Sequence, residues 1–270
     1  MKYAVLIVLC QILAISTHGQ ERKLVWSDEF EYSGAPDAKK WLFEIGDGCP
    51  AMCGWGNHEK QYYTNSPQNA RVDSGRLIIE AHKAEYNGYN YTSAKVVSKG
   101  KGDWLYGWVE VRARLPKGKG TWPAIWMLPT LDRAMQWPMD GEIDIMEHVG
   151  YNHGMIYGTI HTDKFNHTRG TQKSDSIRID DLHEEFHVYS IDWNPERISW
   201  YVDGQVYCTV EKGNEDQAGW PFDKPFHLIL NVAVGGDWGG RHGIDENIWP
   251  QRMEIDYIRV YQSVNNTPSK

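Results

Sequence analysis

Three observations on the sequence predict an all-β protein, a β-jelly-roll sandwich of two antiparallel sheets. Short runs that alternate or cluster β-branched and aromatic residues recur along the chain. Turn residues separate these runs, and no long helical periodicity follows the N-terminal segment. No repeat or linker divides the 270 residues, so one domain of many short strands is expected.

The expected strands, in chain order, are RLIIEA, WVEVRARL, MIYGTIH, HVYSIDW, RISWYVD and EIDYIRVY. Residues of these types fit a pleated surface that is buried on at least one face. Asp203-Gly204, between ISWYV and QVYCTV, is a two-residue hairpin signal. The polar tail from Ser263 to Lys270 is expected to fray.

The N-terminus has the pattern of a secretory signal peptide. Lys2 precedes an apolar run over residues 4–15, and a short polar stretch follows it. This run is too short to span a bilayer comfortably. We therefore expect a signal peptide at residues 1–19, cleaved near Gly19, and a secreted catalytic domain at residues 20–270.

Export places the cysteines in an oxidising compartment. Cys10 leaves with the signal peptide, so three cysteines remain in the mature chain. Cys49 and Cys53 stand close together in a Gly/Pro-rich loop, and we expect a disulfide between them. Cys208 alternates with Val206 and Val210, which predicts a buried free thiol on a strand. Zinc binding is disfavoured because so few ligands have suitable spacing.

The formal net charge of -8 disfavours a nucleic-acid partner and an anionic polysaccharide. The chain has 13 Trp and 15 Tyr but only 6 Phe. Flat aromatic rings with a polar edge suit sugar binding, although a β-rich core explains the same surplus. We expect a monomer that binds no membrane once the signal peptide is removed.

Three acidic residues stand within six positions of the segment DGEIDIMEHVG, residues 140–150. In a regular strand Glu142 and Asp144 point to one face, and Ile143 and Ile145 point to the other. Like charges this close repel each other and separate their pKa values. Glycoside hydrolysis uses such a pair, because one carboxylate attacks while a protonated carboxyl donates to the leaving oxygen.

Glu147 lies an odd number of positions from Glu142 and Asp144, so a regular strand sends it to the opposite face. One extra residue in the strand, a β-bulge, restores it to the same face. We therefore expect a bulge near Ile145 or Met146 that gathers the three acids in one cleft.

Carboxylates placed in this way can lie ~5–5.5 Å apart, the separation found in retaining glycosidases. In this interpretation Glu142 is the nucleophile and Glu147 is the general acid/base. Asp144 hydrogen-bonds or shares a proton and helps to set the pKa values of both. An exposed acidic strand edge and a calcium site are alternative interpretations of the three acids.

The segment Glu142-Ile-Asp-Ile-Met-Glu147 matches in full the pattern E-[ILV]-D-[ILV]-[AFM]-E. In this the chain resembles the laminarinase branch of glycoside hydrolase family 16. The resemblance covers nearly the whole mature chain, in the order LVWSDEF, GWGNHEKQYYT, YGWVEVRARLP, GTWPAIWMLP, NVAVGGDWGG and MEIDYIRVYQ. It implies a jelly roll with a concave substrate groove and retaining hydrolysis without a catalytic cofactor.

The two glutamates begin and end a six-residue segment, which resembles the motif of β-1,3-glucanases. Lichenases and xyloglucan enzymes have one residue fewer between their two glutamates. The resemblance therefore implies a retaining endo-β-1,3-glucanase that acts on neutral laminarin-type β-glucan. Mixed-linkage β-1,3-1,4-glucan is a further candidate substrate. The main alternative is a non-catalytic β-glucan recognition protein, although such relatives lack the paired glutamates. An agar or carrageenan enzyme and a transglycosidase also stay open.

The resemblance also implies residues that bind the sugar. Trp122 and Trp126 resemble groove tryptophans, and their equal strand parity allows both to face the groove, although core packing stays open. Asn57 and Glu59 in GNHE resemble residues that hydrogen-bond glucose hydroxyls. Trp137 is expected to form a wall of the site, and Trp238 to lie at the distal end of the groove. His161 resembles a groove histidine near the acid/base, although it could equally be a structural histidine.

A structural calcium ion is implied on the convex face, away from the acids. Its ligands would be Glu29, Asp256 and the main-chain carbonyl of Gly75, which are the hard oxygens that calcium takes. The two acids could equally be solvated surface residues.

Lys95 departs from the family pattern, because relatives often have arginine where this chain reads YTSAK. Lysine cannot make a bidentate contact, so any role of that arginine in sugar binding is in doubt.

Three N-x-S/T sequons occur, at Asn90, Asn166 and Asn265, and could carry glycans in a eukaryotic host.

Overall fold

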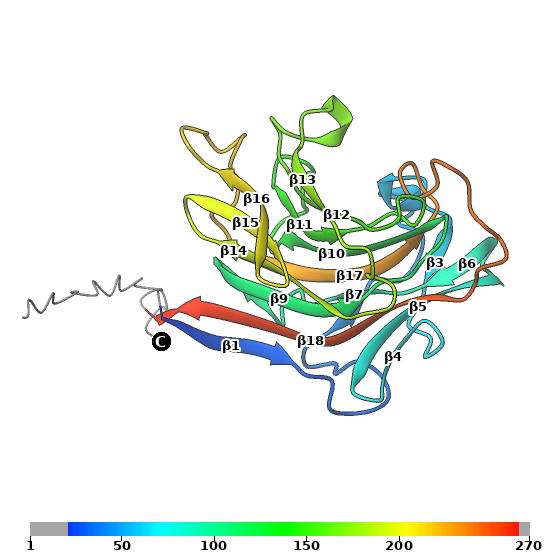
Figure 1. The fold of residues 1–270 in the computed structure, drawn as a ribbon. Helices are drawn as coiled ribbons and strands as arrows, with labels where there is room; N and C mark the ends of the chain where they lie inside the picture. Colours follow the sequence, from blue (N-terminus) through cyan, green and yellow to red (C-terminus); the bar gives the residue numbers. More distant parts are fainter. Residues whose placement is uncertain (1–20, 265–270) are drawn as a thin grey trace, which may run out of the picture.

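The computed structural model describes residues 21–264, which form two β-sheets packed face to face (Figure 1). This confirms the predicted jelly-roll sandwich. Helical structure in this part of the chain is limited to two short 3₁₀ turns, η1 (Cys53–Gly56) and η2 (His167–Arg169). The expected signal peptide, its cleavage point, Cys10 and the Asn265 sequon lie outside the described residues.

The first sheet has ten strands within the described chain, and β1 lies beside β18 so that both ends of the fold meet (Figure 1). Two short strands join at its sides: β1 (Arg22–Asp28) pairs with β18, and β4 (Ala70–Asp73) pairs with β5. The main path runs through β16 (Gln205–Glu211), β15 (Arg197–Val202), β14 (His187–Trp193), β9 (Gly107–Arg114), β18 (Gln251–Ser263), β5 (Arg76–Tyr86), β6 (Tyr89–Ser93) and β3 (Gln61–Tyr63).

The second sheet has eight strands and carries the predicted catalytic segment. All described pairs in both sheets are antiparallel except β3 with β6, which is parallel. The short strand β8 (Asp103–Trp104) pairs with β17. The path runs through β13 (Lys173–Arg178), β12 (Met155–His161), β11 (Glu142–Glu147), β10 (Thr121–Pro129), β17 (Phe226–Val234), β7 (Lys95–Val97) and β2 (Leu42–Phe43).

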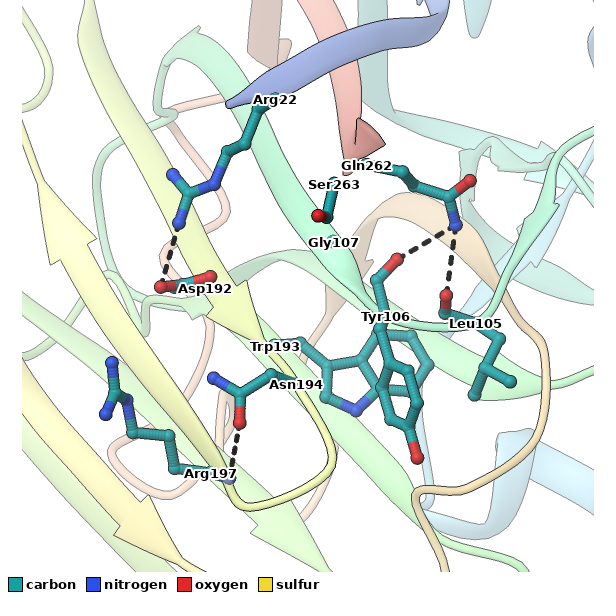
Figure 2. A pocket seen from close by; sticks show the side chains of 10 residues that line it. All are labelled: Arg22, Leu105, Tyr106, Gly107, Asp192, Trp193, Asn194, Arg197, Gln262 and Ser263. Atoms are coloured by element: carbon teal, nitrogen blue, oxygen red, sulfur yellow. Dashed lines mark hydrogen bonds and ion pairs between the residues drawn. The ribbon is translucent and has the colours of Figure 1, made fainter. Parts of the chain in front are cut away.

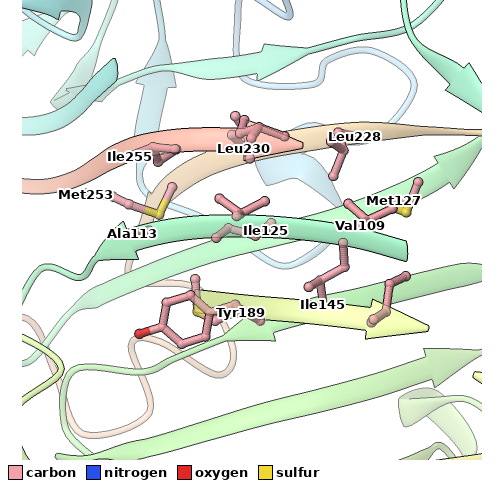
Figure 3. Packing of buried hydrophobic residues seen from close by; sticks show 14 of the residues in the cluster. Val109, Ala113, Ile125, Met127, Ile145, Tyr189, Leu228, Leu230, Met253 and Ile255 are labelled. Carbon is pink, nitrogen blue, oxygen red and sulfur yellow. The ribbon is translucent and has the colours of Figure 1, made fainter. Parts of the chain in front are cut away.

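The core fills the space between the two sheets (Figure 3). Strand β9 follows the alternation of a half-buried strand, with Val109, Val111 and Ala113 inward and charged residues outward. Ile125 and Met127 of β10 meet these residues from the other sheet (Figure 3). Fully burying such a side chain contributes roughly 1.5–3 kcal/mol, so this layer fixes how the two sheets face each other.

Strand β17 is buried on both faces, because each of its nine residues is buried. Leu228, Leu230 and Val232 belong to the core between the sheets. Asn231 has the opposite parity and faces away from that core, yet it is only 6% exposed. Side chains from neighbouring elements therefore cover the outer face of β17, which is the face that carries the site.

Three local predictions are confirmed. Asp203 and Gly204 have φ values of 49° and 78°, as a type I′ turn requires, and they join β15 to β16. Cys49 and Cys53 form a disulfide. Cys208 is a free cysteine and is 7% exposed.

The two described sequons differ in exposure. Asn90 is exposed, whereas Asn166 is buried and its amide nitrogen donates to the main-chain oxygens of Thr162 and Asp163. Of the two sequons within residues 21–264, Asn90 alone therefore offers an exposed amide for a glycan.

Within residues 21–264, the fold contains no helix of the length and apolarity needed to cross a membrane.

Candidate active site

Strand β11 contains the bulge that the sequence predicts. Against β12, Asp144 pairs with Thr159 and Glu147 with Tyr157, so β11 advances three residues where β12 advances two. Against β10, the register likewise breaks between Met146 and Asp144. The extra residue is Ile145, which confirms the predicted position.

The bulge sends the three acids to one face of the sheet. The partners of Asp144 and Glu147 on β12, Thr159 and Tyr157, have equal parity, so both acids face the same side. Glu142 pairs with His161 on that same face. The apolar side chains of β11 are buried in the core on the other face: Ile143, Ile145 and Met146.

A core tryptophan holds the bulge from the opposite sheet. The indole nitrogen of Trp200 in β15 donates to the main-chain oxygen of Asp144 at 2.7 Å. Trp200 is fully buried, and the space it occupies requires glycine at position 158, because a Cβ there would lie 2.5 Å from the indole ring.

Each glutamate accepts a hydrogen bond from a tryptophan. Trp137 Nε1 donates to Glu142 Oε2 at 3.0 Å, and Trp122 Nε1 donates to Glu147 Oε1 at 3.0 Å. The two carboxylates are therefore each held through one oxygen by a neutral donor.

His161 joins the cluster of acids. Its Nε2 lies 3.4 Å from Asp144 Oδ2 and 3.7 Å from Glu142 Oε1. The ring is buried and contacts Trp137 and His167, with ring centroids 5.9 Å and 5.1 Å away. Sequence reasoning did not find His167, which lies in the short turn η2 and is marked in the sequence only as the middle residue of the Asn166 sequon.

Burial raises the pKa of all three acids above their ordinary values. The charge of Asp144 raises the pKa of Glu142 and Glu147 further, while His161 and the tryptophan donors oppose the shift. Acids that share a buried site in this way retain protons at a pH where exposed carboxyls are ionised. The cluster can therefore supply a carboxylic acid and a carboxylate together.

Trp126 begins a chain of hydrogen bonds that leads to Glu59. Its Nε1 donates to Asn231 Oδ1 at 2.7 Å, and Asn231 Nδ2 donates to the Tyr63 hydroxyl at 3.0 Å. That hydroxyl and Gln61 Nε2 both donate to Glu59 Oε2, at 3.2 Å and 2.6 Å. Burial raises the pKa of Glu59, while these donors and Asn57 lower it.

Lys95 lies between two tryptophans. Its ammonium is 4.1 Å from the centre of the Trp55 ring and 5.1 Å from that of Trp126, and it pairs with Glu44 at 2.7 Å. Lys95 is opposite Asn231 in the sheet, so it lies on the face that carries the acids. The side chain is only 8% exposed. The predicted departure from arginine therefore places a buried charge beside two indoles.

Trp238 lies near the acid/base candidate. Its ring centre is 5.6 Å from that of Trp122 and 5.1 Å from that of Tyr157. Trp122 and Trp126 are partly exposed and bond to side chains on the outer face, so neither belongs to the core between the sheets. Of the seven predicted binding residues, Trp122, Trp137 and His161 contact the acids directly, and Trp238 reaches them through Trp122. Trp126 pairs in register with Asp144 on the adjacent strand, and Glu59 and Asn57 follow it along the chain of hydrogen bonds.

The residues expected to bind calcium lie on or beside strands of the other sheet, and both carboxylates are paired with arginines. Arg259 donates to both oxygens of Glu29, at 3.0 Å and 2.8 Å. Arg112 donates to Asp256 at 2.6 Å. Gly75 lies in the turn between β4 and β5. Calcium would have to displace two arginines from these carboxylates.

A separate pocket of about 310 Å³ lies where β1 begins and β18 ends (Figure 2). Arg22 pairs there with Asp192 at 2.9 Å, and Gln262 donates to the main-chain oxygens of Leu105 and Tyr106. None of the predicted site residues lines it. It has no part in the arrangement around the three acids.

Comparison with known proteins gives a consistent result. The chain is 52% identical over 250 residues to the beta-glucanase of Rhodothermus marinus, a match that spans 90% of this chain and 86% of that one. The X-ray structure of the laminarinase from Rhodothermus marinus superposes with a TM-score of 0.86 at 50% identity, covering 90% and 98% of the two chains.

A second solved structure, SCLam, is described as a non-specific endo-β-1,3(4)-glucanase; its TM-score is 0.83 at 47% identity, with 90% and 91% of the chains covered. The family model of glycosyl hydrolases family 16 matches residues 57–259, three-quarters of the chain and the whole of the site around the acids. The chain therefore belongs to glycosyl hydrolases family 16.

Proposed function

We propose that this protein is an endo-β-1,3-glucanase that hydrolyses internal bonds of laminarin-type β-glucan, with mixed-linkage β-1,3-1,4-glucan as a further substrate. Members of family 16 are retaining glycosidases and need no cofactor for catalysis. The observation that carries the proposal is the bulge at Ile145, which gathers Glu142, Asp144 and Glu147 on one face.

In the first step Glu142 attacks the anomeric carbon, and the bond between that carbon and the glycosidic oxygen breaks. Glu147 gives its proton to the departing oxygen, so the leaving sugar is released as a neutral alcohol. Burial supports this assignment, because it keeps a carboxyl group protonated at a pH where an exposed glutamate is ionised.

In the second step the covalent glycosyl–enzyme ester is hydrolysed. Glu147, now ionised, takes a proton from water, and the water oxygen bonds to the anomeric carbon while Glu142 leaves as a carboxylate. Two displacements at one carbon retain its configuration. Asp144 interacts with both glutamates, and its charge raises the pKa of each, so it helps to set which of them is protonated at each step.

The aromatic residues around the acids suit a neutral sugar. The partly exposed rings of Trp122, Trp126, Trp137 and Trp238 offer flat apolar faces to sugar C–H groups. Glu59 and Asn57 offer polar groups for hydroxyls, at the end of the chain of hydrogen bonds from Trp126. We propose that these six residues, with His161, line the substrate groove.

The recognition-protein alternative is weaker because both glutamates are present and each accepts a tryptophan hydrogen bond. A transglycosidase would form the same covalent intermediate and pass it to a sugar hydroxyl. The names of the relatives favour hydrolysis of β-1,3-glucan for this chain as well.

Product analysis on laminarin tests the proposal. We expect new reducing ends on oligosaccharides of several lengths, and proton NMR at early times should show the β-anomer first. Mixed-linkage glucan should be cleaved more slowly, and carrageenan not at all. Glu142→Gln is the control and should release no reducing ends. Binding of laminarin without cleavage by the unaltered protein would make it a recognition protein.

Secretion and a monomeric state are also proposals. The N-terminal pattern of residues 1–19 supports export, and mass analysis of the N-terminus after expression in a secreting host would test cleavage near Gly19. Light scattering would test the monomer. Calcium at Glu29, Asp256 and Gly75 is a proposal that the arginine contacts weaken, and a higher melting temperature in calcium than in chelator would support it.

A further inference from the structure

We propose that Glu142, Asp144 and His161 form a binding site for a first-row transition-metal ion such as Zn²⁺, and that metal and glucan exclude each other there. Among the described residues, this is the one group of three or more acidic, histidine or cysteine side chains whose ligand atoms all lie within 4.8 Å of one another. The exclusion of glucan rests on the proposed function, whereas the metal binding does not.

The spacing of the ligand atoms matches a tetrahedral ion. Two ligands bound at Zn²⁺ distances lie about 3.3 Å apart along a tetrahedral edge. His161 Nε2 is 3.4 Å from Asp144 Oδ2 and 3.7 Å from Glu142 Oε1. Small side-chain movements therefore bring three ligand atoms to one ion, and solvent can supply the fourth.

Two buried atoms at this place have no hydrogen-bond partner. Asp144 Oδ2 accepts no hydrogen bond, although its side chain is only 3% exposed and His161 Nε2 lies 3.4 Å away. His161 Nδ1 also has no hydrogen-bond partner, so no neighbouring donor keeps a proton off it, and Nε2 faces the oxygens of Asp144 and Glu142. The neutral ring can therefore carry its proton on Nδ1 and present the lone pair of Nε2 to a metal. An unpaired buried carboxylate oxygen beside it completes the pair of ligands.

The donor set selects the ion. One imidazole nitrogen and two carboxylate oxygens suit zinc, copper and other late first-row ions. Calcium takes six to eight oxygens, and three side chains of which one is an imidazole cannot provide them. We therefore expect Zn²⁺ to bind at these three side chains and Ca²⁺ not to bind there at the same concentration.

Occupation by a metal would block the proposed reaction. The ion would hold Glu142 Oε1, the oxygen that Trp137 leaves free, because the indole binds Oε2. Coordination would engage the lone pair of Glu142 Oε1 and hold this oxygen at the ion, so it could not reach the anomeric carbon. A sugar in position for that attack would in turn cover the ion's place.

A cluster of three histidines elsewhere in the protein provides a control for the metal-binding experiment. His148, His153 and His183 lie with ring centroids 5.3 Å and 4.9 Å apart, and the buried Nε2 of His148 has no partner. This second cluster contains no proposed catalytic or binding residue. His183→Asn breaks this cluster and leaves the proposed metal site intact.

Calorimetry with Zn²⁺ alone on the purified untagged protein tests the site. We expect one strong site, weakened at least about tenfold by His161→Gln and unchanged by His183→Asn. Equal weakening in Glu142→Gln would confirm the carboxylate ligand, with circular dichroism showing that each variant is folded. Zinc binding lost in His183→Asn but kept in His161→Gln, or no binding at all, would overturn the proposal.

Exclusion of glucan is tested in Glu147→Gln, which keeps all three ligands and should not hydrolyse the probe. A laminarin oligosaccharide at saturation should lower the apparent zinc affinity at least about tenfold. Unchanged zinc affinity with the oligosaccharide bound would refute the exclusion. If zinc binds through His161 while the unaltered protein cleaves no glucan, the metal site stands and the proposed function fails; hydrolysis without zinc binding gives the reverse result.

Discussion

The indole nitrogen of Trp200 donates a hydrogen bond to the main-chain oxygen of Asp144, 2.7 Å away. The two residues belong to different sheets, and Asp144 lies where the bulge begins. A bulge disturbs the ladder and leaves main-chain groups that need other partners. This bond supplies one of them from the core, and so it links the packing of the sandwich to the placement of the three acids.

Trp200→Phe removes the donor and keeps most of the ring. We expect the free energy of unfolding to fall by about 1–3 kcal/mol, because a buried carbonyl loses its partner. We also expect a lower kcat, since the bulge loses its support. Denaturant unfolding and initial rates on laminarin measure the two effects.

The matched control is Trp193→Phe. Trp193 is equally buried, and its indole nitrogen donates to the main-chain oxygen of Phe222 at 3.2 Å, away from the bulge. It should lose similar stability and keep its kcat. Equal kcat losses in both variants would show that Trp200 acts only through global stability.

The sequence was sufficient to predict the bulge but not its support. Side-chain parity depends on neighbours along the strand, so the spacing of Glu142, Asp144 and Glu147 required one extra residue. Trp200 is 56 positions from Asp144, and no local pattern joins them. Contacts of this kind depend on how two sheets pack, which the order of residues along one strand does not determine.

Other site residues left weaker signals. Asn231 is the only amide in the apolar strand FHLILNVAV, and a polar residue buried there needs partners, which Trp126 and Tyr63 supply. That signal could have been used. Arg259 and Arg112 lie on strands distant in sequence from the acids with which they pair, Glu29 and Asp256. The sequence match of the two acids therefore gave no sign that arginines would compete with calcium for them.

Glu142→Gln should make the protein more stable at neutral pH. Burial, and then the charge of Asp144, raise the pKa of Glu142 in the folded state above its ordinary value of 4.5. Ionisation therefore costs stability as the pH rises from 4.5 through the raised pKa, and glutamine avoids that cost. Below 4.5 both proteins are neutral at this position, so the gain should vanish. Denaturant unfolding at several pH values measures it.

Glu29→Gln is the control of opposite sign. Arg259 lowers the pKa of Glu29, so its ionised form stabilises the fold at neutral pH and this contribution fades as the pH falls through the lowered value. This variant should be less stable than the unaltered protein at neutral pH. A neutral-pH loss in Glu142→Gln as well would contradict the raised pKa of Glu142.

Glu147→Ala should affect natural glucan more than a substrate with an activated leaving group. An aryl leaving group departs without full protonation, whereas a sugar alcohol needs the proton from Glu147. Rates of the first step on laminarin and on an aryl β-glucoside of a laminarin oligosaccharide measure the difference. Equal losses on the two substrates would remove Glu147 from the acid role.

Lys95→Met should weaken glucan binding with little change in kcat. The ammonium lies beside the rings of Trp55 and Trp126, and cation–π contacts of a desolvated charge are worth about 2 kcal/mol or more. Without the charge, the two indoles lose a common partner that holds them in place. We therefore expect a higher KM from initial rates on laminarin.

Lys95→Arg separates the charge from the shape of the side chain. A guanidinium keeps the positive charge, pairs with Glu44 and stacks on indole rings, so KM should stay close to that of the unaltered protein. In Lys95→Met the carboxylate of Glu44 is left without its partner, and an uncompensated charge is itself destabilising. Adding Glu44→Gln to Lys95→Met removes that charge, so any increase in KM that persists in the double variant comes from the tryptophans. A double variant that binds laminarin as well as the unaltered protein would show that Lys95 serves only to neutralise Glu44.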